Sequence, residues 1–199
     1  MTFMPTKSPF DLFDMWLQDA ESSEPNDPNA MALATVDKRG RPAVRIVLLK
    51  GHDERGFCFF TNTSSAKGKA LAVNQVAALN FFWKSKGRQI RIDGRVEPVS
   101  SEEADTYFAS RPRGSRIGAW ASQQSQTLKN GRPDLLAAVE AVEQKYDGQE
   151  DIPRPPHWSG YRVIPDTIEF WQAGEFRLHD RGVYERQSVD AWSWRWLNP

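Results

Sequence analysis

Short apolar runs, many of them alternating with polar residues, recur along most of the chain. This pattern is typical of β-strands, because successive side chains of a strand face opposite sides of the sheet. The runs predict strands at 31–36, 42–50, 56–61, 76–83, 89–99, 160–163, 167–171, 176–181, 183–187 and 192–196.

Four segments have helical spacing instead. Ser8 followed by Pro9 is a typical helix start. Phe10, Phe13 and Trp16 then recur every three or four residues, which predicts a helix at about 8–21. A capping box begins at Ser100. Further helices are predicted at 63–73, 100–111 and 133–146.

Many short strands with few helices favour a closed or nearly closed antiparallel barrel with peripheral helices. We therefore expect a mainly β fold in a single domain, residues 1–199. The strands do not alternate with helices, and neither a G-x-G-x-x-G motif nor a P-loop occurs, which disfavours a Rossmann-type NAD enzyme. The proline-rich segment 151–156 is interpreted as a loop, because strand signals resume directly after it.

Composition narrows the classes of function. The 199 residues carry 26 basic and 26 acidic side chains, so we expect neither nucleic acid nor an anionic membrane as partner. No apolar run approaches a membrane span, and residues 1–9 lack the apolar core of an export signal. Cys58 is the only cysteine, which excludes an internal disulfide and fits a cytoplasmic protein.

Several common chemistries have no support in the sequence. The three histidines are far apart, and no pair has the spacing of metal ligands, so we expect no metal site. Cys58 lies between phenylalanines and is interpreted as a small core residue. No G-x-S-x-G motif supports a serine hydrolase.

Charge is uneven along the chain, and segment 110–132 holds five basic residues and no acid. Tyr107, Arg111 and Ser115 follow one another at intervals of four, a spacing at which they could converge on one phosphate. An ordinary exposed helix end is the alternative. Because the net charge is zero, the segment indicates a small anion rather than a polymer.

Two further patterns suggest binding sites. Arg45 and Lys50 flank an apolar run, and strand alternation would place them on opposite faces; two exposed strand-end charges are the alternative. On a strand, Arg177, His179 and Arg181 would share one face with no acid among them. Such a group repels itself unless an anion or an electron-rich ring lies within it, which favours a functional role.

These motifs closely resemble those of the pyridoxine/pyridoxamine 5′-phosphate oxidase family, in the same order and over nearly the whole chain. They are RIVLLK (45–50), FTN (60–62), RPRGS (111–115), IGAW (117–120), QS (124–125), EFWQ (169–172) and RLHDR (177–181). The resemblance implies an FMN-binding split β-barrel that forms a homodimer, with FMN at the subunit interface and segment 160–199 supplying strands for dimerisation and the substrate site.

The resemblance also implies residue roles. The FMN set would be Arg45, Ile46, Val47, Leu48, Leu49, Lys50, Phe60, Thr61, Ser65, Lys67, Gln89, Gln124, Ser125, Trp171 and Arg181. The substrate set would be Lys50, Tyr107, Arg111 and Ser115 at the 5′-phosphate, with Arg177 and His179 as catalytic residues near the pyridine ring. A hydride would pass from the substrate's C4′ to the flavin, and O2 would reoxidise the flavin to give H2O2.

The sequence departs from the family pattern in two places. Ala66 stands where the family usually has an arginine that binds the FMN phosphate, and segment 1–7 holds no Arg-Arg pair of the kind that covers bound substrate. Two alternatives therefore stay open: a split-barrel flavin oxidase or reductase acting on another small ring, and a non-catalytic protein that binds FMN or pyridoxal phosphate.

Overall fold

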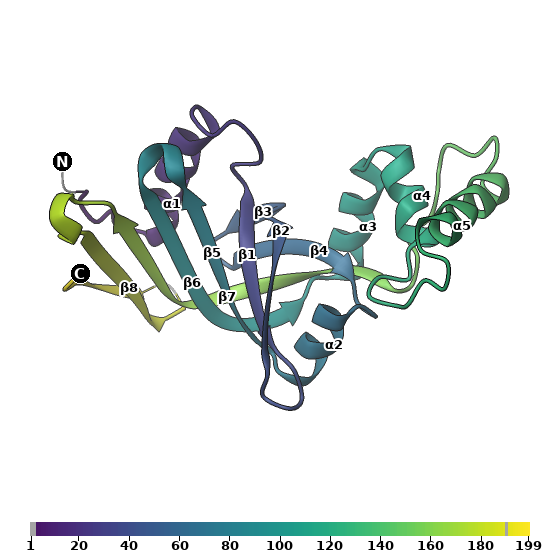
Figure 1. Ribbon diagram of the computed structural model, residues 1–199. Coiled ribbons are helices and arrows are strands. Elements are labelled where there is room, and N and C mark those ends of the chain that lie inside the picture. Colours follow the sequence, from purple (N-terminus) through teal and green to yellow (C-terminus); the bar gives the residue numbers. More distant parts are fainter. Residues whose placement is uncertain (1–2, 190) are drawn as a thin grey trace.

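The computed structural model describes residues 3–189 and 191–199. These residues form one nine-stranded antiparallel sheet and five α-helices (Figure 1). The strands are β1 (Ala30–Val36), β2 (Pro42–Leu48), β3 (Gly51–Asp53), β4 (Gly56–Asn62), β5 (Val76–Trp83), β6 (Arg88–Pro98), β7 (Trp158–Gln172), β8 (Asp180–Ser188) and β9 (Ala191–Leu197). The helices are α1 (Pro9–Glu21), α2 (Ala66–Val73), α3 (Ser101–Ser110), α4 (Arg113–Ala121) and α5 (Arg132–Lys145).

The sheet is a curled, open half-barrel. Its strand order is β2-β1-β5-β6-β7-β4-β3, and β8 pairs with both β7 and β9. One edge of β7 pairs with β6 along its length, whereas the other edge pairs first with β4 and then with β8. The predicted mainly β split barrel with peripheral helices is confirmed.

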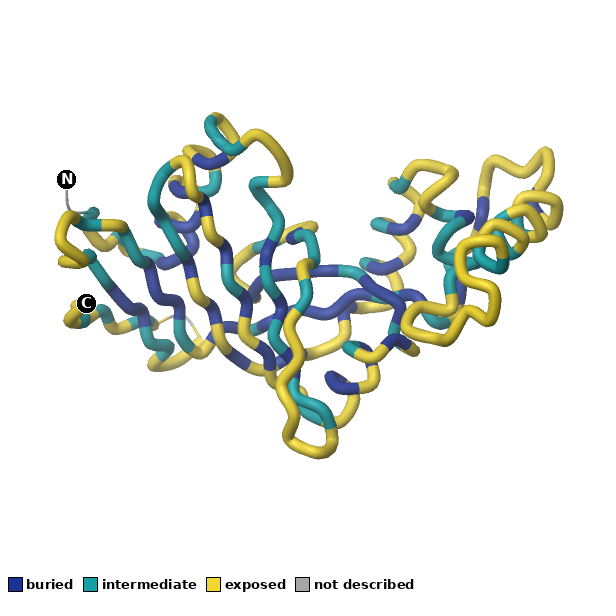
Figure 2. Tube along the Cα trace, in the orientation of Figure 1, coloured by how far each residue is buried: buried dark blue, intermediate teal, exposed yellow. Residues whose placement is uncertain are grey.

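One face of the sheet, called here the inner face, packs against α1 and holds the core (Figure 2). Leu33, Leu79, Ile92 and Ile168 lie in one register row of this face and are fully buried. The ring of Phe13 on α1 lies 4.9 Å from that of Phe57 and 5.3 Å from that of Phe81. The opposite, outer face leaves apolar side chains of β2 and β5 exposed, among them Val44, Ile46 and Phe82.

Helices α3, α4 and α5 form a separate lobe beyond the N-terminal end of β7 (Figure 1). Ile117, Tyr146 and Ile152 make the small core of this lobe. The indole N–H of Trp120 donates to the carbonyl of Pro153 at 2.7 Å and ties α4 to the proline-rich segment, which is a loop as expected. None of the described helices is both long and apolar enough to cross a membrane.

The strands predicted at 160–163 and 167–171 are two halves of β7. A register shift at Asp93 and Gly94 leaves Asp166 as an extra residue in β7, so the apolar alternation changes phase there. A Cβ atom on Gly94 would lie 2.0 Å from the carbonyl oxygen of Ile164, so only glycine fits at this bulge.

The strand predicted at 176–181 is wrong. Residues Glu175–Arg177 form a 3-10 turn, and β8 begins only at Asp180. Phe176 and Arg177 have φ angles of 53° and 66°, in the left-handed region that a strand never uses. The period-two argument that put Arg177, His179 and Arg181 on one strand face therefore does not hold.

Two other predictions are corrected. Lys50 follows the end of β2, so strand alternation does not relate its direction to that of Arg45. Its backbone N–H donates to the carbonyl of Cys58. Segment 113–121 is a helix that the sequence analysis missed, because Pro112, Gly114 and Gly118 oppose a helical assignment. Pro112 precedes the helix, where proline costs nothing.

Candidate functional site

The first group of predicted residues lies at the N-terminus of α2 and is called here the α2 site. Lys67 Nζ donates to Gln124 Oε1 at 2.6 Å and to Thr61 Oγ1 at 3.1 Å. Arg45, on the inner face of β2, donates to the carbonyl of Leu33 at 2.9 Å and to Thr35 Oγ1 at 2.8 Å. The site thus joins β2, β4, α2 and the loop after α4.

Two residues shape the backbone around the α2 site. Ser65 is buried and caps α2, with its hydroxyl accepting from the N–H of Gly68. The N–H of Ala66 donates to Ser125 Oγ at 3.2 Å, and Ser125 has a φ of 70°. The first turn of α2 therefore brings helix N–H groups, a hydroxyl and Lys67 together, a combination that suits an anion.

The cations of the α2 site have no acidic partner within the part of the chain that the structure describes. Among the described residues, no carboxylate forms an ion pair with Arg45 or Lys67. Burial, and then repulsion from Arg45, holds the pKa of Lys67 below its usual value. Burial likewise lowers the pKa of Arg45. A bound anion would relieve both effects, because it favours the charged form of each group.

The other residues of the RIVLLK motif are divided between the faces of β2. Val47 is opposite Met31 on the inner face, whereas Ile46 and Leu48 are opposite Ala32 and Ala30 on the outer face. Leu49 follows the strand and is buried. The motif therefore offers apolar surface on both sides of an edge strand.

The second group is a stack of rings between β4, α3 and β7, called here the ring site. The ring of Phe60 lies 4.1 Å from that of Tyr107 and 5.3 Å from that of Trp158, with nearly parallel planes. The guanidinium of Arg111 lies 4.8 Å from the Trp158 ring. The sequence analysis did not assign Trp158 to a site. Its ring nevertheless makes a cation–π contact with the guanidinium of Arg111.

Arg111 is the unsatisfied cation of the ring site. Its Nη1 atom is buried and has no hydrogen-bond partner, and burial lowers its pKa. It lines a pocket of about 360 Å³ together with Ser115, Phe60 and Gln124. Lys50 and Tyr107 line a neighbouring cavity of about 490 Å³, which also reaches Phe60. The four predicted phosphate ligands are thus divided between two neighbouring pockets that share Phe60.

The third group lies on the outer face of the sheet and is called here the outer-face site. Gln89, Trp171 and Arg181 are direct register neighbours on β6, β7 and β8. The ring of His179 lies 4.6 Å from that of Trp171, and its Nδ1 accepts from the N–H of Gly174 at 3.1 Å. Arg177 is exposed in the preceding turn.

Glu169 is the residue of this site that sequence reasoning missed. Its nearly buried carboxylate accepts from Arg181 Nε at 2.8 Å and from Arg91 Nη1 at 3.2 Å. An acid from the neighbouring strand thus compensates the charge of Arg181, so this residue does not require a bound anion. The signal was present, since Glu169 stands two residues before Trp171, and period two places both on one face.

The α2 site and the outer-face site lie on opposite faces of one sheet. Arg45 is opposite the core residue Leu33, whereas Arg181 is opposite the outward-facing Trp171. Five strand-to-strand steps separate β2 from β8, roughly 24 Å along the sheet. One small ligand held by a single chain cannot contact both sites.

A metal site and a reactive cysteine are not part of these three groups. No cluster of three His, Cys, Asp or Glu side chains that could hold a metal ion occurs in segments 3–189 and 191–199. Cys58 is buried, and burial raises the pKa of its thiol, so it is not a ready nucleophile.

Comparison with known proteins identifies the family. Residues 17–146 match the family described as pyridoxamine 5′-phosphate oxidase. The chain belongs to this family. Residues 158–199, which include β7, β8 and β9, match the pyridoxine 5′-phosphate oxidase C-terminal dimerisation region. The resemblance found in the motifs is thereby confirmed.

Named relatives in the family share more than half of their sequence with this chain. A pyridoxine/pyridoxamine 5′-phosphate oxidase from Azorhizobium caulinodans is 58% identical over 188 residues, which cover 94% of this chain and 88% of the relative. One from Chelativorans sp. is 56% identical over 197 residues, covering 99% and 93%.

Solved structures show the same fold. PhzG from Burkholderia lata, in complex with tetrahydrophenazine-1-carboxylic acid, superposes with a TM-score of 0.90 at 33% identity, covering 98% of this chain and 94% of PhzG. A pyridoxamine 5′-phosphate oxidase-related, FMN-binding protein from Nostoc punctiforme gives a TM-score of 0.77 at 20% identity, covering 96% and 98%.

Removing the carboxylate of Glu169 tests the outer-face site. Glu169→Gln should lower the free energy of unfolding by about 2–4 kcal/mol, because two guanidinium groups would lose their acid in a largely buried position. Urea unfolding measures the change. Glu185→Gln, which breaks the exposed pair with Arg195 on the neighbouring strands, is the control and should cost clearly less. Equal losses would contradict the assignment of Glu169 as the anchor of Arg181.

Proposed function

We propose that the protein is an FMN-dependent oxidase that converts pyridoxamine 5′-phosphate and pyridoxine 5′-phosphate to pyridoxal 5′-phosphate, with O2 as acceptor and H2O2 as the second product. The observation that carries the proposal is the presence of two distinct groups of partly buried cations that have no acidic partner among the described residues. Arg45 and Lys67 form one, and Arg111 belongs to the other. A phosphorylated cofactor and a phosphorylated substrate require two such sites.

The α2 site suits the phosphate of FMN. Lys67 and Arg45 supply positive charge, and the first turn of α2 adds N–H groups. Thr61, Gln124 and Ser125 supply polar atoms for the ribityl chain, while residues 46–49, Phe60 and Trp171 offer apolar surface for the ring system. Gln89 and Arg181 would complete the set from the outer-face site. When bound, FMN supplies the redox chemistry by accepting a hydride from the substrate's C4′.

The ring site suits the substrate's 5′-phosphate. Arg111 would bind it with its free guanidinium N–H group, assisted by Ser115, Tyr107 and Lys50. Arg177 and His179 would act as the catalytic pair over the pyridine ring. Because Nδ1 of His179 accepts from Gly174, the neutral ring carries its proton on Nε2, the nitrogen left free for a substrate.

Both sets are complete only if two copies of the chain combine. We infer a homodimer in which the outer-face site of one protomer faces the α2 site and the ring site of its partner, with FMN between them. The exposed Val44 and Ile46 on β2 and the match of 158–199 to a dimerisation region support this arrangement. A dimer would also cover apolar surface that a monomer leaves in water.

The likeness to PhzG favours one alternative, an oxidase acting on another small ring. That structure holds a tricyclic carboxylic acid, so a carboxylate rather than a phosphate could be the group recognised. The two functions differ in what Arg111 binds. They are distinguished by the substrate that reduces the flavin.

Anaerobic bleaching tests the proposal. The FMN-loaded protein is mixed without oxygen with pyridoxamine 5′-phosphate, pyridoxamine or tetrahydrophenazine-1-carboxylic acid, and flavin absorbance is followed. We expect rapid bleaching by the first compound alone, followed by recovery of colour and formation of H2O2 on admitting air. Bleaching only by the carboxylic acid would favour the alternative oxidase, and no bleaching by any would favour a binding protein.

The lowered pKa of Lys67 predicts a pH dependence of FMN binding. A bound phosphate favours the ammonium form, so FMN affinity should be constant while Lys67 is protonated and fall as pH rises through a pKa below the usual lysine value. Titrations of FMN and riboflavin from neutral to alkaline pH measure this. Riboflavin, which lacks the phosphate, should not follow the same curve, and Lys67→Met should abolish the difference. Parallel curves in wild type and Lys67→Met would exclude Lys67 as the titrating group.

Ala66 predicts that FMN binding can be strengthened. Ala66→Arg places a guanidinium on the first turn of α2, and one charge-assisted hydrogen bond would tighten FMN by roughly 10- to 100-fold. Tighter FMN should also raise the Tm of the loaded protein. Ala72→Arg, an exposed position further along the same helix, adds equal charge and should change little. Equal affinity in both variants would place the phosphate elsewhere.

Because Arg177 is exposed, replacing it should impair catalysis without weakening FMN binding. Arg177→Ala should lower kcat/KM for pyridoxamine 5′-phosphate by roughly 100-fold or more, because a positive charge near the reacting carbon is lost. FMN affinity should stay within two-fold, since no described contact joins Arg177 to the α2 site. Arg195→Ala, an exposed arginine on β9, is the control. Near-normal turnover in Arg177→Ala would remove Arg177 from the catalytic pair.

A further inference from the structure

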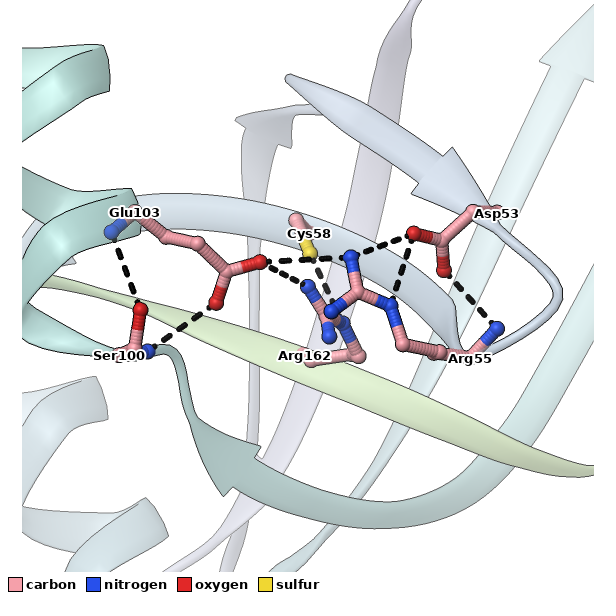
Figure 3. A network of polar contacts seen from close by, with 6 residues as sticks. All are labelled: Asp53, Arg55, Cys58, Ser100, Glu103 and Arg162. Atoms are coloured by element: carbon pink, nitrogen blue, oxygen red, sulfur yellow. Dashed lines mark hydrogen bonds and ion pairs between the residues drawn. The ribbon is translucent and has the colours of Figure 1, made fainter.

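A network of charged side chains, built around one buried arginine, lies beneath the N-terminal half of α3 (Figure 3). Its centre is Arg162 on β7, whose side chain is only 6% exposed. Arg162 Nη2 donates to Glu103 Oε1 on α3 at 2.7 Å, and Nε donates to Cys58 Sγ on β4 at 3.3 Å. One side chain thus connects two strands of the sheet to a helix of the other lobe.

Glu103 uses both of its carboxylate oxygens. Oε1 accepts from Arg162 and, at 3.4 Å, from Arg55, while Oε2 accepts from the backbone N–H of Ser100 at 3.1 Å. The second bond closes the capping box of α3, in which Ser100 Oγ accepts from the N–H of Glu103. Glu103 therefore both completes the N-terminal cap of α3 and anchors the helix to β7.

The network neutralises itself and does not form an anion site. The guanidinium of Arg55 donates two hydrogen bonds to the carboxylate of Asp53 and its backbone N–H donates a third, while Glu103 lies between Arg55 and Arg162. The cavity of about 490 Å³ beside it therefore contains matched charges at this end. This contrasts with the α2 site, where the cations have no acid, and it indicates that the network serves to hold α3.

The helix that the network holds carries the ring site. Tyr107 is one turn after Glu103, and Arg111 follows at the end of the helix. Beneath the first turn of α3, the apolar cluster consists of Cys58, Val99 and Ala104, with Phe60 packed against it. Further along the helix, the rings of Tyr107 and Phe108 pack against Trp158. Because the side chains under the first turn are small, the directed ion pair between Arg162 and Glu103 fixes the rotation of this end of the helix.

We propose that Arg162 is a positioning residue for the substrate-phosphate site, acting through Glu103 to set the rotation of α3 and hence the places of Tyr107 and Arg111. The proposal rests on the function proposed above for Tyr107 and Arg111. Arg162 belongs to neither predicted ligand set, although it lines the cavity of about 490 Å³ together with Lys50 and Tyr107. It acts from the face of β4 and β7 that lies under the helix.

The test compares Arg162→Met and Glu103→Gln with Glu102→Gln. Glu102 is adjacent on the same helix, is exposed and takes no part in the network, so its variant controls for the loss of one negative charge. In the FMN-loaded protein, both network variants should raise KM for pyridoxamine 5′-phosphate by roughly 10- to 100-fold, as expected for ligands moved out of place. Their kcat and FMN affinity should stay within two-fold of wild type.

Two further variants separate positioning from general stability. The double variant Arg162→Met/Glu103→Gln should be no worse than Arg162→Met alone, because both changes break one interaction. Arg162→Lys keeps the charge and should recover part of the KM effect. An unchanged KM in folded, FMN-loaded Arg162→Met and Glu103→Gln would overturn the proposal, as would KM effects that multiply in the double variant.

A spectroscopic measurement keeps the proposal separate from the proposed function. The near-ultraviolet circular dichroism of the stacked rings Phe60, Tyr107 and Trp158 reports the rotation of α3 without any ligand. It should change in Arg162→Met and Glu103→Gln but not in Glu102→Gln. If wild type oxidises no phosphorylated substrate, the proposed function fails, and this spectrum still decides the positioning. An unchanged spectrum in both network variants would overturn it.

Discussion

Strand β7 is the constraint on which the rest of the structure depends. One of its edges pairs with β6, and its other edge is divided between β4 and β8. Its inward side chains, such as Val163 and Phe170, complete the core. Its outward side chains serve different sites along the strand: Trp158 supports the ring site, Arg162 anchors α3, and Glu169 with Trp171 builds the outer-face site.

This arrangement requires the bulge at Asp166. Val163 and Ile168 both face the core, yet they are an odd number of positions apart along the strand, so an unbroken strand would turn one of them outward. The extra residue restores the alternation, and the register shift opposite Gly94 accommodates it. A bulge of this kind also bends the strand, which contributes to the open curl of the sheet.

Some cations pair with a carboxylate of the same chain, and others have no carboxylate partner among the described residues. Arg162 and Arg181 each have a carboxylate within 3 Å, supplied by Glu103 and Glu169. Such pairs fix geometry in positions with little solvent. Arg45, Lys67 and Arg111 are partly buried without an acid, a state that costs desolvation energy and is favourable only when an anion arrives. By this distinction, Arg45, Lys67 and Arg111 are the cations that we propose to bind ligand phosphates, whereas Arg181 could contribute to the FMN site only while it stays paired with Glu169.

The sequence predicted the strands and most helices because their apolar period is clear, and the motifs predicted the family. It did not predict the turn at 175–177, since nothing local indicates that Phe176 and Arg177 adopt left-handed angles. Side-chain contacts between segments that are far apart in the sequence could not be predicted either. Arg162 and Glu103 are 59 residues apart, and only the placement of α3 against β7 brings them together. Segment 160–163 and segment 167–171 looked separate because the bulge interrupts their common pattern.

The faces of the sheet keep Arg45 and Arg181 of one chain apart. Arg45 and Arg181 are fixed on opposite faces by a register that cannot slip without turning the core outward. A ligand that needs both must therefore lie between two copies, at the free edge of β2 and against the outer face of β6, β7 and β8. Binding and assembly are then linked, because a ligand bound only by the paired state stabilises that state in proportion to its affinity. The cations at the α2 site, which have no acidic partner among the described residues, would then favour binding of the anion. They would also favour association of the second chain, because that chain completes the surroundings of the bound anion.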